Sequence, residues 1–376
     1  MNKYVAYLNT YYNRPCTAQL LWWYYYLIDH LPNTHLILNY DYEKISKNRW
    51  EYAQYKKAPY EYSDPKNLSP KYFSIMKRFE EYPELEGIES PTELTRRSIT
   101  TPVLSIVNEI LEILEKQDNI TAGISWVNNA SFDEACKIMG IPSIHNEDGT
   151  LRKPFVKTNY FDFSGVNGNT EFDKRFKLFK KIENKVKIFS VEELIKIITL
   201  PSYLDYVEML RKQTPTYECG VALQVDVDTN VLAFNNNISE TDVINIASKS
   251  YNGSLLIRNH PLSSTGYLKP ASLGGELDTS SNSLEFVSKC KKIYTLNSSV
   301  AFEALLFGKE VRIFGDNPFR QLQFMNKDEL ISALNFAVFS YLIPTTRLYD
   351  ENYYSMRINC KDEEYIYNEG QKYWLK

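Results

Sequence analysis

The stretch KKIYTLNSSVAFEALLFGKEVRIFGDNPF, residues 291–319, decides the fold of this chain. Its apolar runs, turn residues and helix signals predict four consecutive pieces of structure. These are a strand that ends at Leu296, a turn over 297–299, a helix over 300–307 that Gly308 ends, and a strand over 311–314. A strand, a helix and a second strand in this order form half of a parallel α/β unit.

The turn before this helix carries a pair of serines, Ser298 and Ser299, just beyond the carboxyl end of a strand. The N-terminus of a helix exposes unpaired backbone N–H groups and a partial positive charge, so this place suits a phosphate group. Ser299 is also a good N-cap residue, and that structural role alone explains a serine there. Glu303 follows Ser299 by four residues, whereas the acid of a capping box follows the cap by three. An acid at this place is therefore a candidate for contact with a ribose.

Composition and charge exclude several classes of protein. The net charge of −4 and the pI near 5.8 argue against a general nucleic-acid binder. The five cysteines show no CxxC spacing, which is typical of reduced thiols in a cytoplasmic protein. No segment approaches the roughly 18 apolar residues of a membrane span. We therefore expect a soluble cytoplasmic protein, with the inner face of the inner membrane as the place of any peripheral association.

The length of the chain and the succession of expected elements predict two α/β domains. A chain of 376 residues is long enough for two sizeable cores. We expect an N-terminal Rossmann-like domain over residues 1–200, with an insertion at about 43–97 that lacks clean periodicity. A second domain is expected over 201–330, and a helical segment over 331–376 that packs back across the domains. Both domains are expected to be doubly wound.

The individual elements follow from hydrophobic periodicity. Strands are expected at 4–9, 35–41, 122–127, 141–144, 220–225 and 254–258, and helices at 17–30, 102–117, 131–139, 174–187, 240–251 and 327–341. The aromatic helix over 17–30 is expected to be buried, with contact to a membrane or to a lipid-linked acceptor as the alternative.

Acidic and polar residues follow three of these strands. Glu147 follows the strand over 141–144, Asp226 and Asp228 follow the strand over 220–225, and His260 follows the strand over 254–258. Ligands collect at the carboxyl ends of parallel strands, and a central cleft between two doubly wound domains would bring these residues face to face. Two carboxylates across a glycosidic bond serve as nucleophile and proton carrier in a retaining mechanism. The two aspartates are equally typical of turns that end a strand.

Four segments resemble the motifs of a known family. QVDVDTN at 224–230, RNHPL at 258–262 and TLNSSVAFEALLFGKEV at 295–311 are similar to the motif series of bacterial capsule and lipopolysaccharide O-antigen Kdo transferases. IHNEDGTLRKPFVKTNYFDFSGVN at 144–167 resembles the first-domain active-site region of the retaining β-Kdo transferases in that group. The resemblance implies the GT-B architecture, two Rossmann-like domains that face a central cleft. Residues 1–119 carry no matching motif, and Ala301 stands where related transferases often have glycine.

The resemblance also implies catalytic roles for the residues that match its motifs. CMP-β-Kdo would be the donor, and Asp228 would attack its anomeric carbon, displace CMP and form a covalent glycosyl-enzyme. Glu147 would take the proton from the acceptor hydroxyl in the second step. His260 would hold the donor phosphate or the departing oxygen. Asp226 is the rival nucleophile, since the motif offers two acids.

The donor site would combine the serine turn with positive charges. Ser298 and Ser299 would bind phosphate or the sugar carboxylate with Asn297 of the same turn, and Glu303 would contact the ribose of CMP. The carboxylate of Kdo requires cations or amide donors, for which the candidates are Arg152, Lys153, Arg258 and Lys269. The single phosphate of CMP can be met by a helix terminus, serine hydroxyls and a histidine, so no metal ion is expected.

Other functions stay open at this level. The same fold also suits a GT-B transferase with another nucleotide-activated donor, an inverting transferase, or a non-catalytic module that binds a nucleotide or a glycan. The expected partners are a nucleotide-sugar donor and a saccharide or lipid-linked glycan acceptor, and no nucleic acid. The acceptor sugar, the linkage and the oligomeric state do not follow from the residues.

Overall fold

The computed structural model describes residues 2–8, 26–38, 73–77, 81–225, 227–251, 254–260 and 274–376. The chain forms two compact units that alternate along the sequence. Unit 1 contains Met1–Glu147, Phe161–Val166 and Thr346–Lys361, and unit 2 contains Asp148–Tyr160, Asn167–Thr345 and Asp362–Lys376. The predicted domain boundaries near residues 200 and 330 stay predictions. The predicted Asp226 and Lys269 lie outside the described residues.

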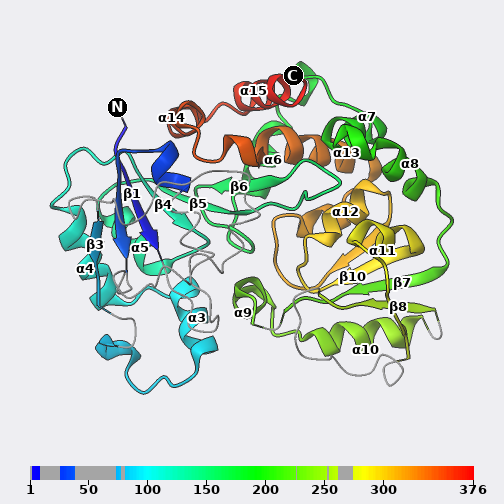
Figure 1. Cartoon of the computed structure of the whole chain (residues 1–376), viewed down its shortest axis with the longest axis horizontal. Helices are drawn as coiled ribbons and strands as arrows, with labels where there is room; N and C mark the ends of the chain where they lie inside the picture. Colours follow the sequence, from blue (N-terminus) through cyan, green and yellow to red (C-terminus); the bar gives the residue numbers. More distant parts are fainter. Residues whose placement is uncertain are drawn as a thin grey trace. The chain divides into compact units, whose positions relative to one another are not determined.

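The first sheet has seven strands in the order β12-β6-β5-β4-β1-β2-β3 (Figure 1). They are β1 (Tyr4–Leu8), β2 (Thr34–Leu38), β3 (Phe73–Ile75), β4 (Ala122–Trp126), β5 (Ser143–Asp148), β6 (Thr158–Asp162) and β12 (Leu342–Pro344). β3, β2, β1, β4 and β5 pair in parallel, and β12 pairs with β6 in antiparallel fashion. Every residue of β1 and β4 is buried, as is typical of parallel strands that are covered on both faces.

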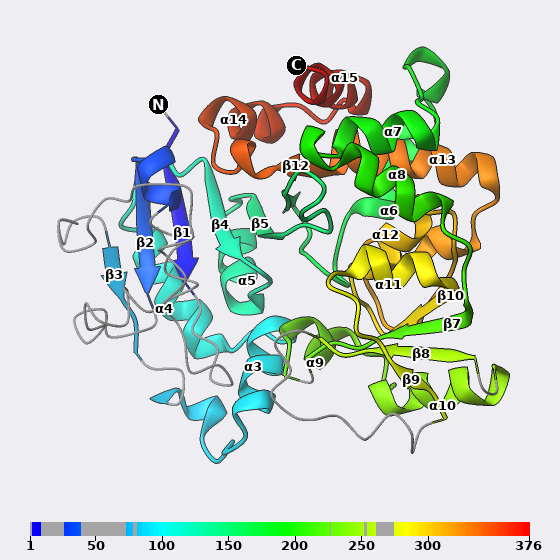
Figure 2. The ribbon, with the colours of Figure 1, turned by 45° about the vertical axis from the view of Figure 1, so that its right-hand side comes forward.

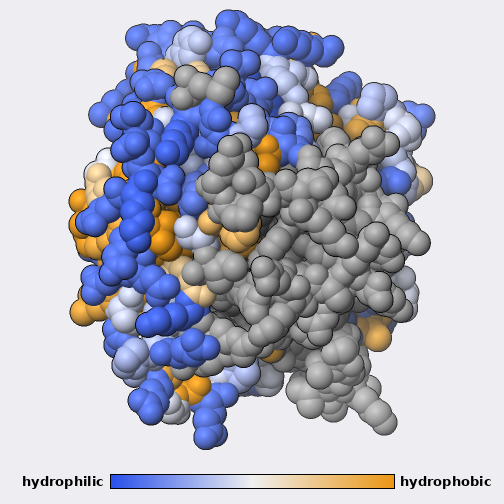
Figure 3. Space-filling model, turned by 60° about the vertical axis from the view of Figure 1, so that its left-hand side comes forward, coloured by the Kyte–Doolittle hydropathy of each residue, from blue (hydrophilic) through white to orange (hydrophobic). Residues whose placement is uncertain are grey.

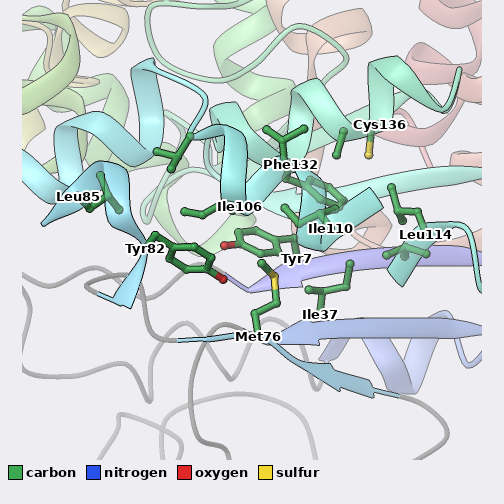
Figure 4. Packing of buried hydrophobic residues seen from close by; sticks show 14 of the residues in the cluster. Tyr7, Ile37, Met76, Tyr82, Leu85, Ile106, Ile110, Leu114, Phe132 and Cys136 are labelled. Atoms are coloured by element: carbon green, nitrogen blue, oxygen red, sulfur yellow. The ribbon is translucent and has the colours of Figure 1, made fainter. Parts of the chain in front are cut away.

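Helices α3 (Pro91–Thr100), α4 (Leu104–Leu114) and α5 (Ala130–Ile138) belong to unit 1, together with α14 (Glu351–Asn359). The apolar residues of α4 recur every three or four positions, which places them on one face of the helix. Figure 4 shows this face at Ile106 and Ile110, packed above Tyr7 of β1 beside Phe132 of α5. The rings of Tyr7 and Phe132 stack with their centroids 5.4 Å apart. This cluster is the core of unit 1.

The second sheet has five parallel strands in the order β11-β10-β7-β8-β9. They are β7 (Tyr217–Ala222), β8 (Leu255–Arg258), β9 (Glu276–Leu277), β10 (Cys290–Thr295) and β11 (Glu310–Ile313). Helices α11 (Ser283–Lys289) and α12 (Val300–Leu306) lie on one face of this sheet, and α10 (Glu240–Ser250) lies on the other (Figure 2). Counted from β7 along the chain, the strand order is 3-2-1-4-5, which is the order of a Rossmann-like domain.

The remaining helices of unit 2 lie before or after this sheet in the chain, except α9, which follows β7. They are α6 (Phe172–Phe179), α7 (Val191–Ile198), α8 (Leu204–Lys212), α9 (Thr229–Phe234), α13 (Lys327–Phe336) and α15 (Glu363–Trp374), with a π-helical turn at Ala337–Tyr341. The predicted α/β class with two Rossmann-like sheets is confirmed.

Some predicted elements are wrong in their bounds. The strand predicted to end at Ile144 continues to Asp148, so Glu147 lies inside β5 rather than beyond it. β5 pairs with β4 as far as Asn146 and has β6 as its other neighbour, so a central place in the sheet outweighs the low strand propensity of this polar segment. The helix predicted over 174–187 ends at Phe179, and a short 3-10 turn, Glu183–Lys185, follows it. The segment predicted as an insertion of helices and loops also contains strand β3.

Hydrophilic residues cover most of the described surface in the view of Figure 3, with smaller hydrophobic areas between them. Single exposed apolar residues such as Leu104 and Ile138 are ordinary for a folded protein. Among the described residues, every helix is too short or too polar to span a bilayer.

Candidate functional site

The candidate residues of unit 2 gather where the second sheet reverses its strand order. β7 and β10 are neighbours in this sheet. The strand that follows β7 in the chain lies toward one edge of the sheet, and the strand that follows β10 lies toward the other. The crevice beyond the carboxyl ends of such a strand pair is the usual ligand site of an open α/β sheet. β7 leads toward Asp228, and β10 leads directly into the turn with Ser298 and Ser299. The topology therefore brings the predicted nucleophile and the predicted phosphate-binding turn to one edge.

Asp228 is the N-cap residue of α9. Its backbone is extended, and its Oδ1 accepts a hydrogen bond of 3.0 Å from the Asn230 N–H. Its own N–H donates to the carbonyl oxygen of Val225 at 2.8 Å, which closes the turn that follows β7. The structural role that the sequence left open for this aspartate is therefore realised. The cap also holds the half-buried carboxylate in a defined orientation at the end of the sheet.

Asn297 locks the turn after β10 to the start of α9. Its N–H donates to Gln224 Oε1 at 3.0 Å, and its Nδ2 donates to the Asn230 carbonyl at 3.1 Å. Asn230 returns the contact, because its Nδ2 donates to the Asn297 carbonyl at 3.3 Å. Asn297 is only 1% exposed. Its side-chain amide thus holds the Asp228 turn against the serine turn, and its predicted contact with the donor stays a prediction.

The two serines meet the start of α12 in different ways. Ser299 occupies the N-cap position, as predicted, but its backbone angles are helical and its side chain makes no capping hydrogen bond. Ser298 Oγ accepts the Val300 N–H at 3.3 Å instead. The carbonyl oxygen of Ser299 accepts a hydrogen bond of 2.9 Å from Thr150 Oγ1. Thr150 lies inside the motif segment at 144–167, but sequence reasoning did not single it out.

Glu303 lies on α12, one turn beyond the serines, and is 6% exposed. Burial raises the pKa of its carboxyl to about 7, although a hydrogen bond with Ser283 and the positive charges of Arg152 and Arg258 act in the opposite direction. Its Oε2 is buried and makes no hydrogen bond within the described part of the chain. A buried carboxylate oxygen without a donor is expensive, so this atom calls for a ligand hydroxyl or amide.

The loop between β5 and β6 brings Arg152 close enough to Glu303 to influence its pKa. Gly149 begins this loop, and a Cβ there would lie 2.5 Å from Thr158 Oγ1 and 2.8 Å from the Thr158 carbonyl carbon. Glycine is therefore needed for this close approach. Thr150 then ties the loop to α12 through the Ser299 carbonyl. Arg152 itself is exposed, and its guanidinium is available to an anionic ligand.

Arg258, at the end of β8, has a partner that the sequence did not suggest. Its Nη1 donates to Asp278 Oδ2 at 2.5 Å and to the Ser280 carbonyl at 3.1 Å. The side chain of Asp278 is fully buried. His260 follows Arg258 by two residues and is half-buried. The acidic, serine-rich run ELDTSS at 276–281 is the sequence signal from which Asp278 was recognisable.

In unit 1, Glu147 lies on β5 next to two buried residues that hold this strand. Asn146 Oδ1 accepts a hydrogen bond of 2.9 Å from the hydroxyl of Tyr354 in α14. His145 Nδ1 lies 3.3 Å from the carbonyl oxygen of Val127, and His145 Nε2 lies 3.3 Å from Asp133 Oδ1. These contacts hold β5 from both faces of the sheet next to Glu147.

Metal ligands do not gather in the described ranges: no group of three or more His, Cys, Asp or Glu side chains there could hold an ion. The expectation that the reaction needs no metal stays a prediction.

Comparison with known families gives a match over the N-terminal part of the chain. Residues 6–171 match the model of the Glycosyltransferase 99 family N-terminal domain. The matched segment is slightly less than half of the chain and contains Glu147 and Arg152. It supports the glycosyltransferase resemblance that the motifs predicted. No curated protein matches the sequence.

Solved structures with a similar course of the chain include two Kdo transferases and an epimerase. The Thermosulfurimonas dismutans KpsC β-Kdo 2,7 transferase is 13% identical, with a TM-score of 0.45, over 91% of this chain and 92% of that chain. The β-Kdo 2,4 transferase of the same KpsC is 17% identical, with a TM-score of 0.40, over 63% and 88%. The Methanocaldococcus jannaschii UDP-GlcNAc 2-epimerase is 13% identical, with a TM-score of 0.33, over 95% and 99%.

Proposed function

We propose that this protein is a retaining glycosyltransferase that moves Kdo from CMP-β-Kdo to a saccharide acceptor in the synthesis of a bacterial surface polysaccharide. The observation that carries the proposal is the match of residues 6–171 to the Glycosyltransferase 99 N-terminal domain model. The motif resemblance at 224–230, 258–262 and 295–311 extends the same assignment to unit 2.

The geometry of unit 2 supports a nucleotide in the donor site. Glu303 offers a buried carboxylate oxygen without a donor, which suits the paired hydroxyl groups of a ribose. Ser298 and Ser299 lie one turn away on the same element, where they suit the single phosphate of CMP. His260, at the end of β8, would stabilise the departing phosphate oxygen. The assignment of a monophosphate rather than a diphosphate comes from the motif resemblance.

Arg152 is the proposed partner of the sugar carboxylate. It is exposed, and Thr150 ties its loop to the carbonyl of Ser299 at the start of α12. Arg258 is already bound to Asp278, so its guanidinium is less available to a ligand. An arginine fork matches a carboxylate with two parallel hydrogen bonds. This contact would distinguish a keto-sugar acid from a neutral sugar.

The proposed reaction is a double displacement. The Asp228 carboxylate attacks the anomeric carbon of Kdo, the bond to the phosphate oxygen of CMP breaks, and a glycosyl-aspartate ester forms. The acceptor hydroxyl then attacks the same carbon, Glu147 takes its proton, and the ester bond to Asp228 breaks. Two inversions leave the anomeric configuration of the donor unchanged.

A membrane surface is the proposed location of the acceptor. The exposed residues of α6 include Lys174, Lys177 and Leu178, and Leu178 is 41% exposed, whereas Phe172 and Phe176 are buried. Lysines around an exposed leucine suit the surface of an anionic membrane, where a lipid-linked acceptor would lie. Co-sedimentation with vesicles that contain anionic lipid, compared between the wild type and a Lys174→Glu/Lys177→Glu variant, tests this association.

Intact-protein mass spectrometry with CMP-Kdo tests the proposed reaction. The wild-type protein is expected to gain the mass of one Kdo unit, and Glu147→Gln is expected to increase the occupancy of this adduct because the second step slows. Asp228→Asn should abolish it. Turnover that persists in both Asp228→Asn and Asp226→Asn without any adduct would rule out the nucleophile. A panel of CMP-, UDP-, GDP- and CDP-linked donors tests the donor, and NMR of the product's anomeric configuration separates retention from inversion.

A further inference from the structure

Arg258 lies between two acidic side chains of unit 2. Its Nη1 is bound to Asp278 Oδ2 and to the Ser280 carbonyl, and its positive charge also acts on Glu303. Helix α11 connects the two sites, because Ser283 forms a hydrogen bond with Glu303 while the ring of Phe286 lies 6.0 Å from the Arg258 guanidinium carbon. Both contacts come from the same helix, three residues apart, so they lie on one helical face.

Glu303 nevertheless keeps one buried oxygen without a hydrogen bond in the described part of the structure. A guanidinium close to a buried carboxylate would normally pair with it in a bidentate ion pair. Arg258 does not do so, because Asp278 holds it. Asp278 is itself strongly fixed, since its Oδ1 accepts hydrogen bonds from the Ser280 N–H at 3.1 Å and from Ser280 Oγ at 2.5 Å. Lys289 Nζ lies 3.5 Å from the same oxygen.

We infer that Asp278 is a positioning residue of the donor site, which holds the Arg258 guanidinium away from Glu303 and so keeps the Glu303 carboxylate open to the hydroxyl groups of the nucleotide ribose. The inference rests on the proposed function, because it assigns the ribose contact to Glu303. It explains why two buried acids are needed beside one arginine. Without Asp278, Arg258 and Glu303 would neutralise each other and the ribose would lose its acceptor.

Asp278→Asn tests the inference, because the amide keeps the shape of the side chain and removes its charge. Arg258 is then expected to pair with Glu303, and the affinity for CMP should fall by roughly tenfold or more, the equivalent of one charge-assisted hydrogen bond. The double variant Asp278→Asn/Arg258→Gln removes the released guanidinium and is expected to recover most of the affinity. Isothermal titration calorimetry with CMP measures all three proteins at one pH.

If Asp278 had only a structural role, the losses of CMP affinity from the two substitutions would add. Recovery of the affinity in the double variant therefore distinguishes the positioning role from a structural one. Unchanged CMP affinity in Asp278→Asn overturns the inference, and so does a double variant that binds more weakly than the single one. Should Asp278→Asn fail to fold because it leaves a buried positive charge, the double variant, which has no such charge, carries the test alone. It must then bind CMP within a few-fold of the wild type.

A second measurement, made without nucleotide, separates this inference from the proposed function. Because of Glu303, the free energy of unfolding of the wild type is expected to fall as the pH rises from 4.5 to 7. Glu303→Gln is expected to remove this pH dependence. In Asp278→Asn the new pair with Arg258 should remove this loss too. If the wild type does not bind CMP while this pH dependence behaves as expected, the nucleotide assignment fails and the positioning by Asp278 stands. If the pH dependence stays unchanged in Asp278→Asn, the positioning fails.

Discussion

At the scale of single residues, Glu303 destabilises the folded protein and is also the proposed ligand of the ribose. It sits on a short helix among apolar neighbours, where burial raises the pKa of its carboxyl to about 7. The unfolded chain ionises this group near pH 4.5, so the folded protein resists an ionisation that the unfolded protein accepts. An acid retained under such conditions is typical of a functional site.

Replacing Glu303 with glutamine should therefore stabilise the free protein. The gain is absent below pH 4.5, grows as the pH rises toward 7, and reaches about 3 kcal/mol at most above pH 7, since each pKa unit corresponds to about 1.4 kcal/mol. Urea unfolding at pH 4.5 and pH 8 measures it. The same variant should bind CMP more weakly, because a glutamine is a poorer acceptor. Glu112, an exposed acid of α4, changed to glutamine, serves as the control.

Arg152 gives a second prediction at this scale. Arg152→Ala is expected to weaken the binding of a donor that carries a sugar carboxylate by about tenfold or more, through loss of a charge-assisted hydrogen bond, and to leave the affinity for free CMP nearly unchanged. Competition between CMP-Kdo and CMP in a binding assay measures the difference. Lys153→Ala tests the neighbouring candidate from the sequence: its ammonium lies over the ring of Tyr203, so its loss is expected to leave both affinities nearly unchanged. Equal losses for both ligands would contradict the role of Arg152.

At the scale of elements, α15 is fitted closely to the π-helical turn at Ala337–Tyr341. A Cβ on Gly370 would lie 1.7 Å from the carbonyl oxygen of Phe339, so the helix and the turn touch through backbone atoms. The π-helical turn is fully buried. Propensity would favour almost any residue over glycine in the middle of a helix. The contact between the two elements is the reason for a glycine at this position.

Gly370→Ala is expected to destabilise the protein by at least ~2 kcal/mol, because the overlap forces α15 away from the turn. This change in the free energy of unfolding is opposite to the usual one, because alanine normally stabilises a helix interior relative to glycine. Thermal unfolding monitored by circular dichroism gives the change. Lys372→Ala, at an exposed position of the same helix, should have little effect. A stabilising Gly370→Ala would show that the approach of α15 is looser than described.

At the scale of the whole molecule, a buried ion pair within unit 2 joins two residues that are far apart in the chain. Arg175 of α6 binds Glu363 of α15 through Nε at 2.6 Å and through Nη2 at 3.0 Å. Arg175 also donates to the Ser340 carbonyl at 3.0 Å in the π-helical turn. Both charged side chains are buried. The pair therefore couples the C-terminal helix to residues at the start of unit 2.

Glu363→Gln should lower the free energy of unfolding by about 3–5 kcal/mol, because it removes the carboxylate that binds the buried Arg175 guanidinium at 2.6 Å. An Arg175→Met/Glu363→Leu double variant removes both charges and is expected to recover most of this loss. Denaturant unfolding of the three proteins completes a double-mutant cycle. If the double variant is as unstable as the single one, packing rather than charge compensation explains the effect.

How far the sequence predicts this molecule depends on the range of the interactions involved. The strand and helix over 290–306 follow from local apolar patterns and turn residues, and both are found within one or two residues of their predicted bounds. Prediction was wrong where the tertiary structure decides the local structure. β5 continues to Asp148 as a central strand between β4 and β6, although its polar residues by themselves favour a loop.

The sequence by itself determined the α/β class, the acidic and serine-rich ends of the strands, and the motif series that suggests a Kdo transferase, because these depend on residue type and spacing. Only the tertiary structure decided that Asn297 locks two turns together, that Thr150 reaches the start of α12, and that Asp278 takes up Arg258. These contacts join residues that are far apart in the chain, and residue order carries no local signal for them. In the stretch over 291–319, it is the tertiary structure that shows the Glu303 carboxylate to be buried, with an Oε2 that makes no hydrogen bond in the described part of the chain.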